Sequence, residues 1–187
     1  MKVQIEMKGV KEALEILDPK VHTKALVSTL NRVGSMAATQ AKRKIRETYN
    51  IRQKDIKVMM QRASDTFPTA YLKIPHQASP LILFGGKHSR KMPGARVEVI
   101  RGNRKVITSS FITNVKAVTK GGDESSHAGI FRRVAKTRLH IKQLYGPSPG
   151  GMMREQWPEM QVYISSIFLP ILEHNITFWV VRLAKGA

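Results

Sequence analysis

The sequence contains no cysteine, few aromatic residues and few acids. The absence of cysteine excludes disulfide bonds, thiolate nucleophiles and zinc sites built on thiolates. Aromatic residues make up 6% of the chain and hydrophobic residues 42%, so we expect a globular protein with a mostly aliphatic core. A length of 187 residues favours one domain, or one domain with an extended arm.

The scarcity of acids makes the chain strongly basic. Lysine and arginine number 32 against 13 aspartates and glutamates, giving a net charge of +19. A net charge of about 2–8 is enough for the solubility of a small domain. The excess predicts a polyanionic partner, namely nucleic acid, an anionic membrane or an acidic protein surface. A solvated basic face without a partner is the simpler alternative.

No apolar run is long and uninterrupted. The first ten residues lack the apolar run of a signal peptide, so export by that route is not expected. The stretch Val162–Leu183 is apolar, but Glu173, His174 and Asn175 interrupt it and Pro170 lies inside it. A membrane-spanning helix needs about 20 predominantly apolar residues. We therefore predict no membrane span.

Helices are predicted from caps and from periodicity. Asp18-Pro19 is typical of a helix start, and the helix is expected to reach Tyr49. A strand is predicted at residues 2–7, a short helix at 10–17 and another at 53–62. The buried stripe of the long helix is predicted to hold Leu26, Leu30, Val33, Ala37, Ala41 and Ile45.

The middle of the chain has the two-residue period of strands. Strands are predicted in residues 68–76, 80–86, 95–102, 104–114 and 128–135, with a hairpin turn at 101–104. A long helix, apolar on several faces, is predicted from Met152 to Ala184. The predicted fold is α+β: a small, mostly antiparallel sheet packed with a long helix in the N-terminal half and a long C-terminal helix.

Two regions are predicted along the chain. The first is an α+β body, residues 1–150, whose basic loop 85–95 is expected to become ordered on assembly. The second is a C-terminal helical arm, residues 151–187, which packs on the body or on neighbouring subunits.

The search for catalytic chemistry is negative. The sequence has no GxxxxGK[ST], GxGxxG or GxSxG motif, and its six histidines show no metal-binding spacing. The acids are scattered, and a solvated turn is the better interpretation of the adjacent pair Asp123-Glu124. We predict a protein that is not an enzyme and has no cofactor or metal. A nuclease, the third class considered, would need Mg²⁺-dependent cleavage.

Two basic segments carry the strongest functional signal. Seven Lys/Arg and one acid lie between Lys87 and Lys105, and five Lys/Arg and no acid between Arg132 and Lys142. Few aromatics interleave with them, so contact through phosphates without sequence preference is expected if the partner is DNA. An acidic face of a neighbouring protein is an equal alternative. The candidate contact residues are Lys87, Arg90, Lys91, Arg96, Arg101, Arg104, Lys105, Arg132 and Arg133.

The C-terminal helix supplies a second candidate surface. A helix that is apolar on several sides is usually buried between neighbours, and in a small chain these can be other copies. The alternative is that the same side chains form the core of one chain. The candidate interface residues are Trp157, Met160, Ile164, Phe168, Ile171 and Trp179.

An ordered series of motifs over nearly the whole chain resembles the minor tail protein Z (tail completion) family of long-tailed bacteriophages. The most specific block is Phe131–Ser148, where His140 stands in place of the proline of many relatives. The other matching motifs are Gly9…Ala13-Leu14, Ala25-Leu26…Leu30-Asn31-Arg32-Val33 with a basic exit toward Tyr49, Ser110-Phe111-Ile112 and Gly129-Ile130.

The resemblance implies a structural virion protein that completes the tail and joins it to the head, at the head-proximal end of the tail. It implies an α+β fold related to neck proteins and a ring of identical copies. The implied partners are tail-terminator, tail-tube or head-connector proteins, together with genomic DNA through its phosphates. The implied location is the tail or neck of the virion, with host cytoplasm during assembly. The alternative is a cellular, sequence-independent nucleic-acid-binding protein.

Overall fold

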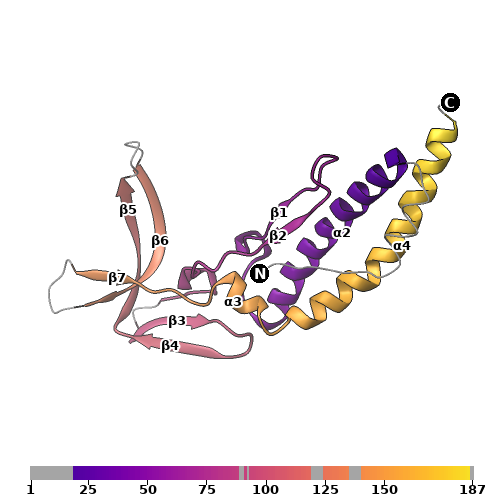
Figure 1. Ribbon diagram of the computed structural model, residues 1–187. Coiled ribbons are helices and arrows are strands. Elements are labelled where there is room, and N and C mark those ends of the chain that lie inside the picture. Colours follow the sequence, from indigo (N-terminus) through magenta and orange to yellow (C-terminus); the bar gives the residue numbers. More distant parts are fainter. Residues whose placement is uncertain (1–18, 89–90, 92, 119–123, 135–139, 186–187) are drawn as a thin grey trace. The chain divides into compact units, whose positions relative to one another are not determined.

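The structure of the chain, a computed structural model, describes residues 19–88, 91, 93–118, 124–134 and 140–185 (Figure 1). It is α+β, with long helices and small antiparallel sheets, as the sequence predicted. The strand predicted at residues 2–7, the helix at 10–17 and the cap Asp18 lie outside the described residues.

The described residues form two compact units. The helical unit holds residues 19–42, 58–74 and 153–185, and the sheet unit holds residues 43–57 together with the described residues of 75–152. The C-terminal helix therefore groups with the first part of the N-terminal-half helix. The predicted division into a body of residues 1–150 and an arm of residues 151–187 stays a prediction.

Helix α2 (Pro19–Thr48) is the longest element, and its bounds confirm the prediction from Asp18-Pro19 and Tyr49. Its buried side chains recur every four residues, so they follow one stripe along the helix. The stripe consists of Val21, Ala25, Thr29, Val33, Ala37, Ala41 and Ile45. Leu26 and Leu30, predicted in the stripe, are only half-buried. The buried positions on this part of the helix are Ala25 and Thr29, each one residue before a predicted leucine, and then Val33.

Helix α4 (Trp157–Ala184) packs on α2 within the helical unit. It follows the short helix α3 (Pro149–Met153), so the long helix predicted from Met152 is divided in two. The Asn175 amide donates a hydrogen bond to the buried Thr29 hydroxyl at 2.9 Å, which in turn donates to the Ala25 carbonyl at 2.7 Å. These bonds satisfy two polar side chains in the interior, where an unpaired polar group is costly.

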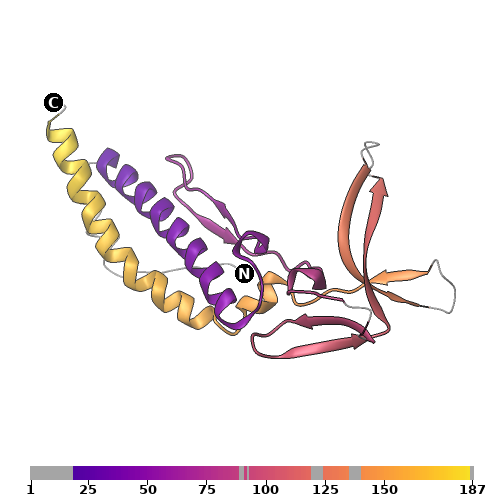
Figure 2. The same ribbon diagram turned by 180° about the vertical axis from the view of Figure 1, so that it is seen from behind.

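The hairpin of β1 (Met59–Gln61) and β2 (Tyr71–Lys73) also packs on α2. The Asn31 side chain holds Ala63 by two bonds: Nδ2 donates to the Ala63 carbonyl at 3.0 Å, and Oδ1 accepts from the Ala63 amide at 2.9 Å. Gly34 leaves room for the Met60 side chain, since a Cβ at this position would overlap the Met60 methyl group. Figures 1 and 2 show this hairpin and α4 on opposite sides of α2.

The helix predicted at residues 53–62 is wrong. Only a 3-10 turn, η1 (Gln53–Asp55), forms there, and Met59–Gln61 is a strand. Pairing with Tyr71–Lys73, the other strand of the hairpin, supplies this segment with ladder hydrogen bonds. Such a partner is not visible in the local charge pattern that suggested a helix.

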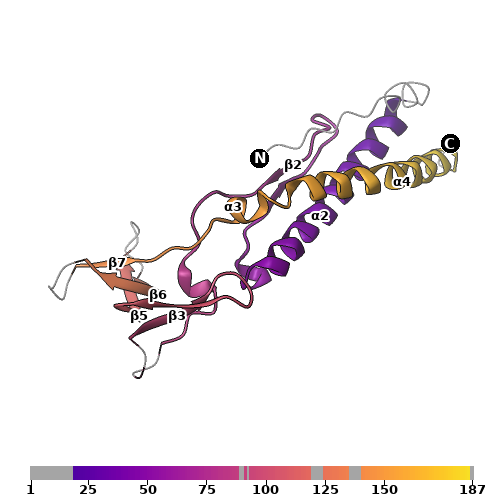
Figure 3. The same ribbon diagram turned by 90° about the horizontal axis from the view of Figure 1, so that it is seen from below.

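The sheet unit contains two antiparallel sheets. Strands β3 (Gly94–Glu98) and β4 (Arg104–Thr108) form the hairpin predicted around residues 101–104. Strands β5 (Ser110–Val118), β6 (Glu124–Arg133) and β7 (Ile141–Gln143) form the second sheet (Figure 3). Ser109, with a φ of 59°, separates β4 from β5, which were predicted as one strand.

A small apolar core joins these sheets. It is built from Leu81, Ala95, Val97 and Ile130. The buried Ser110 ties the strands together, because its hydroxyl accepts from the Ala95 amide at 3.0 Å and donates to the Ile107 carbonyl at 2.6 Å.

The strand predicted at residues 80–86 is wrong, since Leu81–Leu83 forms the 3-10 helix η2. Leu81 and Phe84 are both buried, and one turn of this helix brings side chains three residues apart to the same side. A short, wholly apolar run does not distinguish a buried strand from a buried helical turn.

Helix α4 is the one helix of the described chain that is long and apolar enough to cross a membrane by length and composition alone. Within the segment Trp157–Arg182, an 18-residue window has a mean hydropathy of 1.4, and 17% of that window is buried inside the chain. Core helices of soluble proteins pass the same test, so the prediction of no membrane span stays a prediction.

Candidate partner-binding surface

The β3–β4 hairpin carries basic side chains on both of its faces. Directly opposed residues of antiparallel strands share a face, and the register pairs Glu98 with Arg104 and Val97 with Lys105. Val97 is buried in the core, whereas Lys105 is exposed at the end of the same face. The long stem of a lysine can follow apolar surface while its ammonium group stays in water. Lys105 is therefore available to a partner.

Arg104 is held by Glu98 on the other face. Its Nε donates to Glu98 Oε2 at 2.7 Å, and Glu98 Oε1 accepts from the Gly102 amide at 2.9 Å. The bond from Arg104, followed by the bond from the Gly102 amide, lowers the pKa of Glu98 below its ordinary value of 4.5. Stability from this pair is present above that value and is lost as the pH falls through the lower pKa of the folded state. The pair fixes the turn of the hairpin.

Arg101 caps the end of α2 from the same turn. Its Nε donates to the Arg46 carbonyl at 2.6 Å, and its backbone amide donates to the Thr48 carbonyl at 3.0 Å. The last carbonyls of a helix have no partner within the helix, and a cation there also complements the helix dipole. Arg101 is thus part of the fold, and its side chain is already engaged.

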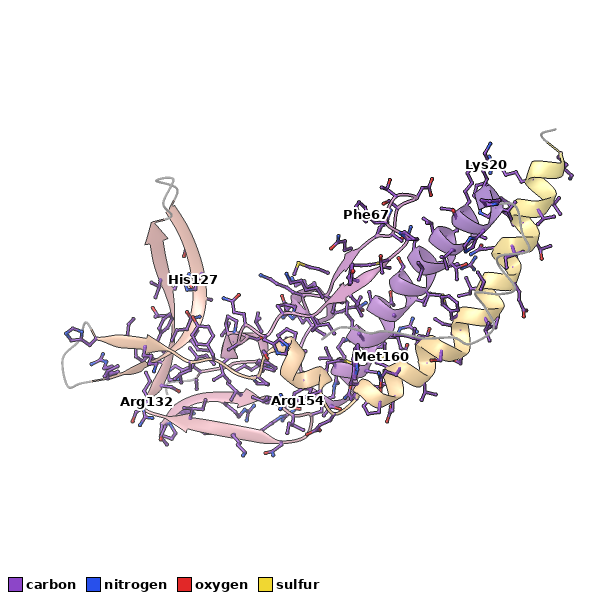
Figure 4. The ribbon with its side chains drawn as sticks, in the orientation of Figure 1. Lys20, Phe67, His127, Arg132, Arg154 and Met160 are labelled. Carbon is purple, nitrogen blue, oxygen red and sulfur yellow. The ribbon has the colours of Figure 1, made fainter. Side chains whose placement is uncertain are left out.

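Strand β6 brings two cations together. The register places Arg132 between Ser110 on β5 and Lys142 on β7, and both cationic side chains are exposed. Like charges directly opposite each other in a sheet are destabilising. Neither side chain forms an ion pair with any described residue. Figure 4 shows Arg132 in this sheet. An anion bound between the two cations would relieve their repulsion.

Arg133 lies on the opposite face of β6. Its guanidinium lies 5.8 Å from the centre of the Phe111 ring, and that ring lies 6.4 Å from the Phe131 ring. Phe131 is buried over Gly129, where a Cβ would come within 2.7 Å of its ring. Arg133 therefore covers an aromatic pair and does not face the same side as Arg132.

The remaining predicted contact residues lie near the start of β3. Lys87 and Arg96 form an isolated antiparallel bridge, with amide-to-carbonyl distances of 2.9 and 2.8 Å. Lys91 is exposed, and Arg96 is half-buried. Arg90 lies outside the described residues, as do Ser89 and Met92.

The structure places the six predicted interface residues of α4 mainly inside the helical unit. Trp157, Met160, Ile164 and Phe168 are buried, and Figure 4 shows Met160 near the start of α4. Ile171 and Trp179 are half-buried. Buried side chains of one chain are not available to a neighbour, so a contact through α4 would use other residues. Its exposed apolar side chains are Val162, Leu169, Phe178, Val180 and Val181.

Two groups of functional interest were not predicted. Lys142 became a candidate only through the pairing of β7 with β6, which no local pattern specifies. At the C-terminal end of α4, Arg182 lies over the Phe178 and Trp179 rings at 5.9 and 5.4 Å. The i,i+3 and i,i+4 spacing of these residues is the signal that a sequence search could have used.

Among the described residues, no group of three or more histidines and acids could hold a metal ion. Asp123 lies outside them. The surface therefore offers cations, hydrogen-bond donors and apolar side chains to a partner.

Compared with known protein families, the chain falls among the structural proteins of phage tails. The family is the prophage minor tail protein Z (GPZ), and it matches residues 7–180. The chain belongs to this family and is a minor tail protein, a component of the virion that contacts other virion proteins. No curated protein and no solved structure matches the chain.

Proposed function

We propose that this minor tail protein completes the tail at its head-proximal end and joins it to the head, as a structural subunit without catalytic activity. The family match over most of the chain supports this role. The observation that carries it is the exposed Arg132–Lys142 pair on β6 and β7, with Lys105 on the neighbouring hairpin of the same unit. A joining subunit lies beside the genome and between other protein rings, where such cations meet polyanions.

The three cations Lys105, Arg132 and Lys142 define what we name the basic surface. Arg101 and Arg104 are excluded from it because their side chains hold the α2 end and the hairpin turn. The surface is defined by its cations, which can contact phosphates of any sequence. The second partner that these cations could bind is an acidic face of an adjacent tail or head protein, which is also negatively charged.

We also propose that copies of the chain assemble with one another in a ring. A ring would place the basic surface of every copy at the same level around the axis. The support is the apolar surface that α4 leaves exposed in one chain. The same surface agrees with the prediction that the helix packs on neighbouring subunits.

A triple variant tests the basic surface: Lys105→Ser, Arg132→Ser and Lys142→Ser. Loss of three phosphate contacts is expected to reduce the salt dependence of DNA binding, d log K/d log[salt], by about 3 and the affinity by roughly 100-fold. The measurement is a DNA titration at two salt concentrations, together with the yield of infectious particles after the chain is added to extracts of a phage lacking it.

The matched control is Arg32→Ser, Arg62→Ser and Lys73→Ser, three exposed cations of the helical unit with the same change in charge. DNA affinity that falls equally in both variants would show a general charge effect and no site. Unchanged DNA affinity with lost particle yield would assign the surface to an acidic protein. If the triple variant retains both, the basic surface has no role in joining.

The second candidate function is a cellular, sequence-independent nucleic-acid-binding protein. The net charge of +19 favours it, and the family match argues against it. It predicts tight, salt-sensitive DNA binding by the chain and normal particles in its absence.

A further inference from the structure

A single phenylalanine stands out on the helical unit. Phe67 is 73% exposed in the loop between β1 and β2, and Figure 4 shows it at the far end of that hairpin. The loop is held by local bonds: the Ser64 amide donates to the Phe67 carbonyl at 3.0 Å, and the Ser64 hydroxyl accepts from the Phe67 amide at 3.2 Å. Singly exposed apolar residues are ordinary. This one matters because the same unit contains a site of complementary chemistry.

That site is a shallow hollow on the C-terminal part of α4. It is lined by His174, Thr177, Phe178, Val181, Arg182 and Lys185. Phe178 and Val181 supply apolar side chains to its lining and remain 48% and 47% exposed. Arg182 and Lys185 add two cationic side chains to the same lining. The hollow therefore combines apolar and positively charged side chains.

Aromatic contacts and α2 hold the side chains around Phe178 in place. The Phe178 and Trp179 rings meet edge to face, with centroids 5.5 Å apart, and Arg182 lies over both. Trp179 Nε1 donates to the Ser28 hydroxyl at 3.3 Å, and Lys24 lies 5.2 Å from the Trp179 ring. A site whose side chains are fixed beforehand loses little conformational entropy when it binds.

We propose that Phe67 of one copy inserts into the α4 hollow of the next copy. An aromatic side chain in an apolar pocket is the usual anchor of a protein interface. Charge agrees with this occupant: Asp65, two residues before Phe67 and exposed, would approach Arg182 and Lys185 in the lining of the hollow. The same chain thus supplies both an apolar acidic tip and an apolar basic hollow.

The arrangement of the helical unit allows copies to connect in series. The β1–β2 hairpin and α4 lie on opposite sides of α2 (Figures 1 and 2). A contact between two different surfaces of identical chains is heterologous, and it generates a closed ring or an open filament. The inference rests on the proposed assembly of copies and names the surfaces that would hold it together.

The absence of cysteine makes a cross-linking test unambiguous. One full-length chain carries Thr66→Cys, beside the phenylalanine, and a second carries Thr177→Cys, in the hollow. A short bismaleimide added to the mixture is expected to give at least tenfold more covalent dimer than either chain gives alone. Adding Phe67→Ala to the first chain is expected to remove this dimer. Thermal unfolding checks that the exposed substitution leaves the fold intact.

The matched control moves the second cysteine to Val162→Cys, an exposed position on α4 that lies 15 residues, or about 22 Å along the helix, from position 177. Cross-linking at position 162 that equals cross-linking at position 177 overturns the proposal, as does a dimer that survives Phe67→Ala. A charge exchange adds a second readout. Asp65→Lys is expected to weaken cross-linking, and Lys185→Glu in the hollow-bearing chain is expected to restore it.

Sedimentation of the unmodified chain distinguishes failure of the Phe67 contact from failure of the proposed assembly of copies. Oligomers without the 66–177 cross-link keep the proposed assembly of copies and overturn the Phe67 contact. Monomers without the cross-link overturn both the assembly of copies and the Phe67 contact.

Binding to vesicles of neutral and anionic lipid tests whether a lipid surface occupies the hollow instead. Vesicle binding that is lost in Val181→Asp and kept in Phe67→Ala would assign the hollow to a lipid surface.

Discussion

Gly94→Val is expected to destabilise the sheet unit strongly. A Cβ at position 94 would overlap the carbonyl group of Ile107 and lie 3.1 Å from the Thr108 Cα on the paired strand. The obstacle is backbone, so it cannot move without breaking the β3–β4 ladder that carries Ala95 and Val97 into the core. A loss of about 3–5 kcal/mol is expected, against a typical domain stability of about 5–15 kcal/mol.

Amide hydrogen exchange of residues 94–115 measures this effect directly, because it reports on the β3–β4 hairpin and β5. The control is Gly102→Asn, at a turn glycine with a φ of 80°, where an added Cβ would have no heavy atom within 4 Å. Asparagine tolerates this backbone conformation, so its cost should stay near or below about 1 kcal/mol. Protection of residues 94–115 that is the same in Gly94→Val and the native chain would show that the close approach is not a constraint.

Asn31→Ala is expected to destabilise the helical unit by about 2–3 kcal/mol and to release the β1–β2 hairpin from α2. The side chain satisfies both the amide and the carbonyl of Ala63, which is 7% exposed. Truncation leaves two poorly solvated backbone groups without partners, and each carries a desolvation cost of about 1–3 kcal/mol. Both tryptophans of the chain lie in the helical unit, so urea unfolding followed by tryptophan fluorescence measures the loss.

The control for this variant is Ser35→Ala, on the same side of α2. Ser35 makes only a 3.8 Å contact with the Met60 sulfur in that direction, so its loss should cost less than about 0.5 kcal/mol. Equal urea midpoints for the two variants would mean that Asn31 does not anchor the hairpin. Because Phe67 lies in the same hairpin, Asn31→Ala should also weaken the 66–177 cross-link.

The sequence predicted those elements whose signals are local. The Asp18-Pro19 start and the four-residue period of small and apolar side chains placed α2 closely. The punctuation around Gly102 and Asn103 placed the β3–β4 hairpin. Strand β1, which pairs with residues 71–73, was missed because the charge pattern of residues 53–62 suggested a helix. Thr29 entered the buried stripe because Asn175, 146 positions away, hydrogen-bonds to its hydroxyl.

The residues of the candidate surface, too, could be predicted only in part from local sequence signals. The sequence identified a basic hairpin, but it did not distinguish cations that hold the fold from cations that remain available. Arg101 binds carbonyls 55 and 53 positions earlier, and Arg104 pairs with Glu98 through the hairpin register. Lys142 was not among the predicted contact residues, because its position beside Arg132 depends on the pairing of β6 with β7. The number of charges in the sequence identifies a basic region. The pairing of the strands then determines which cationic side chains of that region are available to a partner.

The proposed role of this minor tail protein is to complete the tail and join it to the head. The test of this role is electron microscopy of a lysate from a phage lacking only this chain. We expect filled heads beside unattached or non-infectious tails, and infectious particles after the purified chain is added. Joined, infectious particles formed without the chain would contradict this role and favour the nucleic-acid-binding alternative.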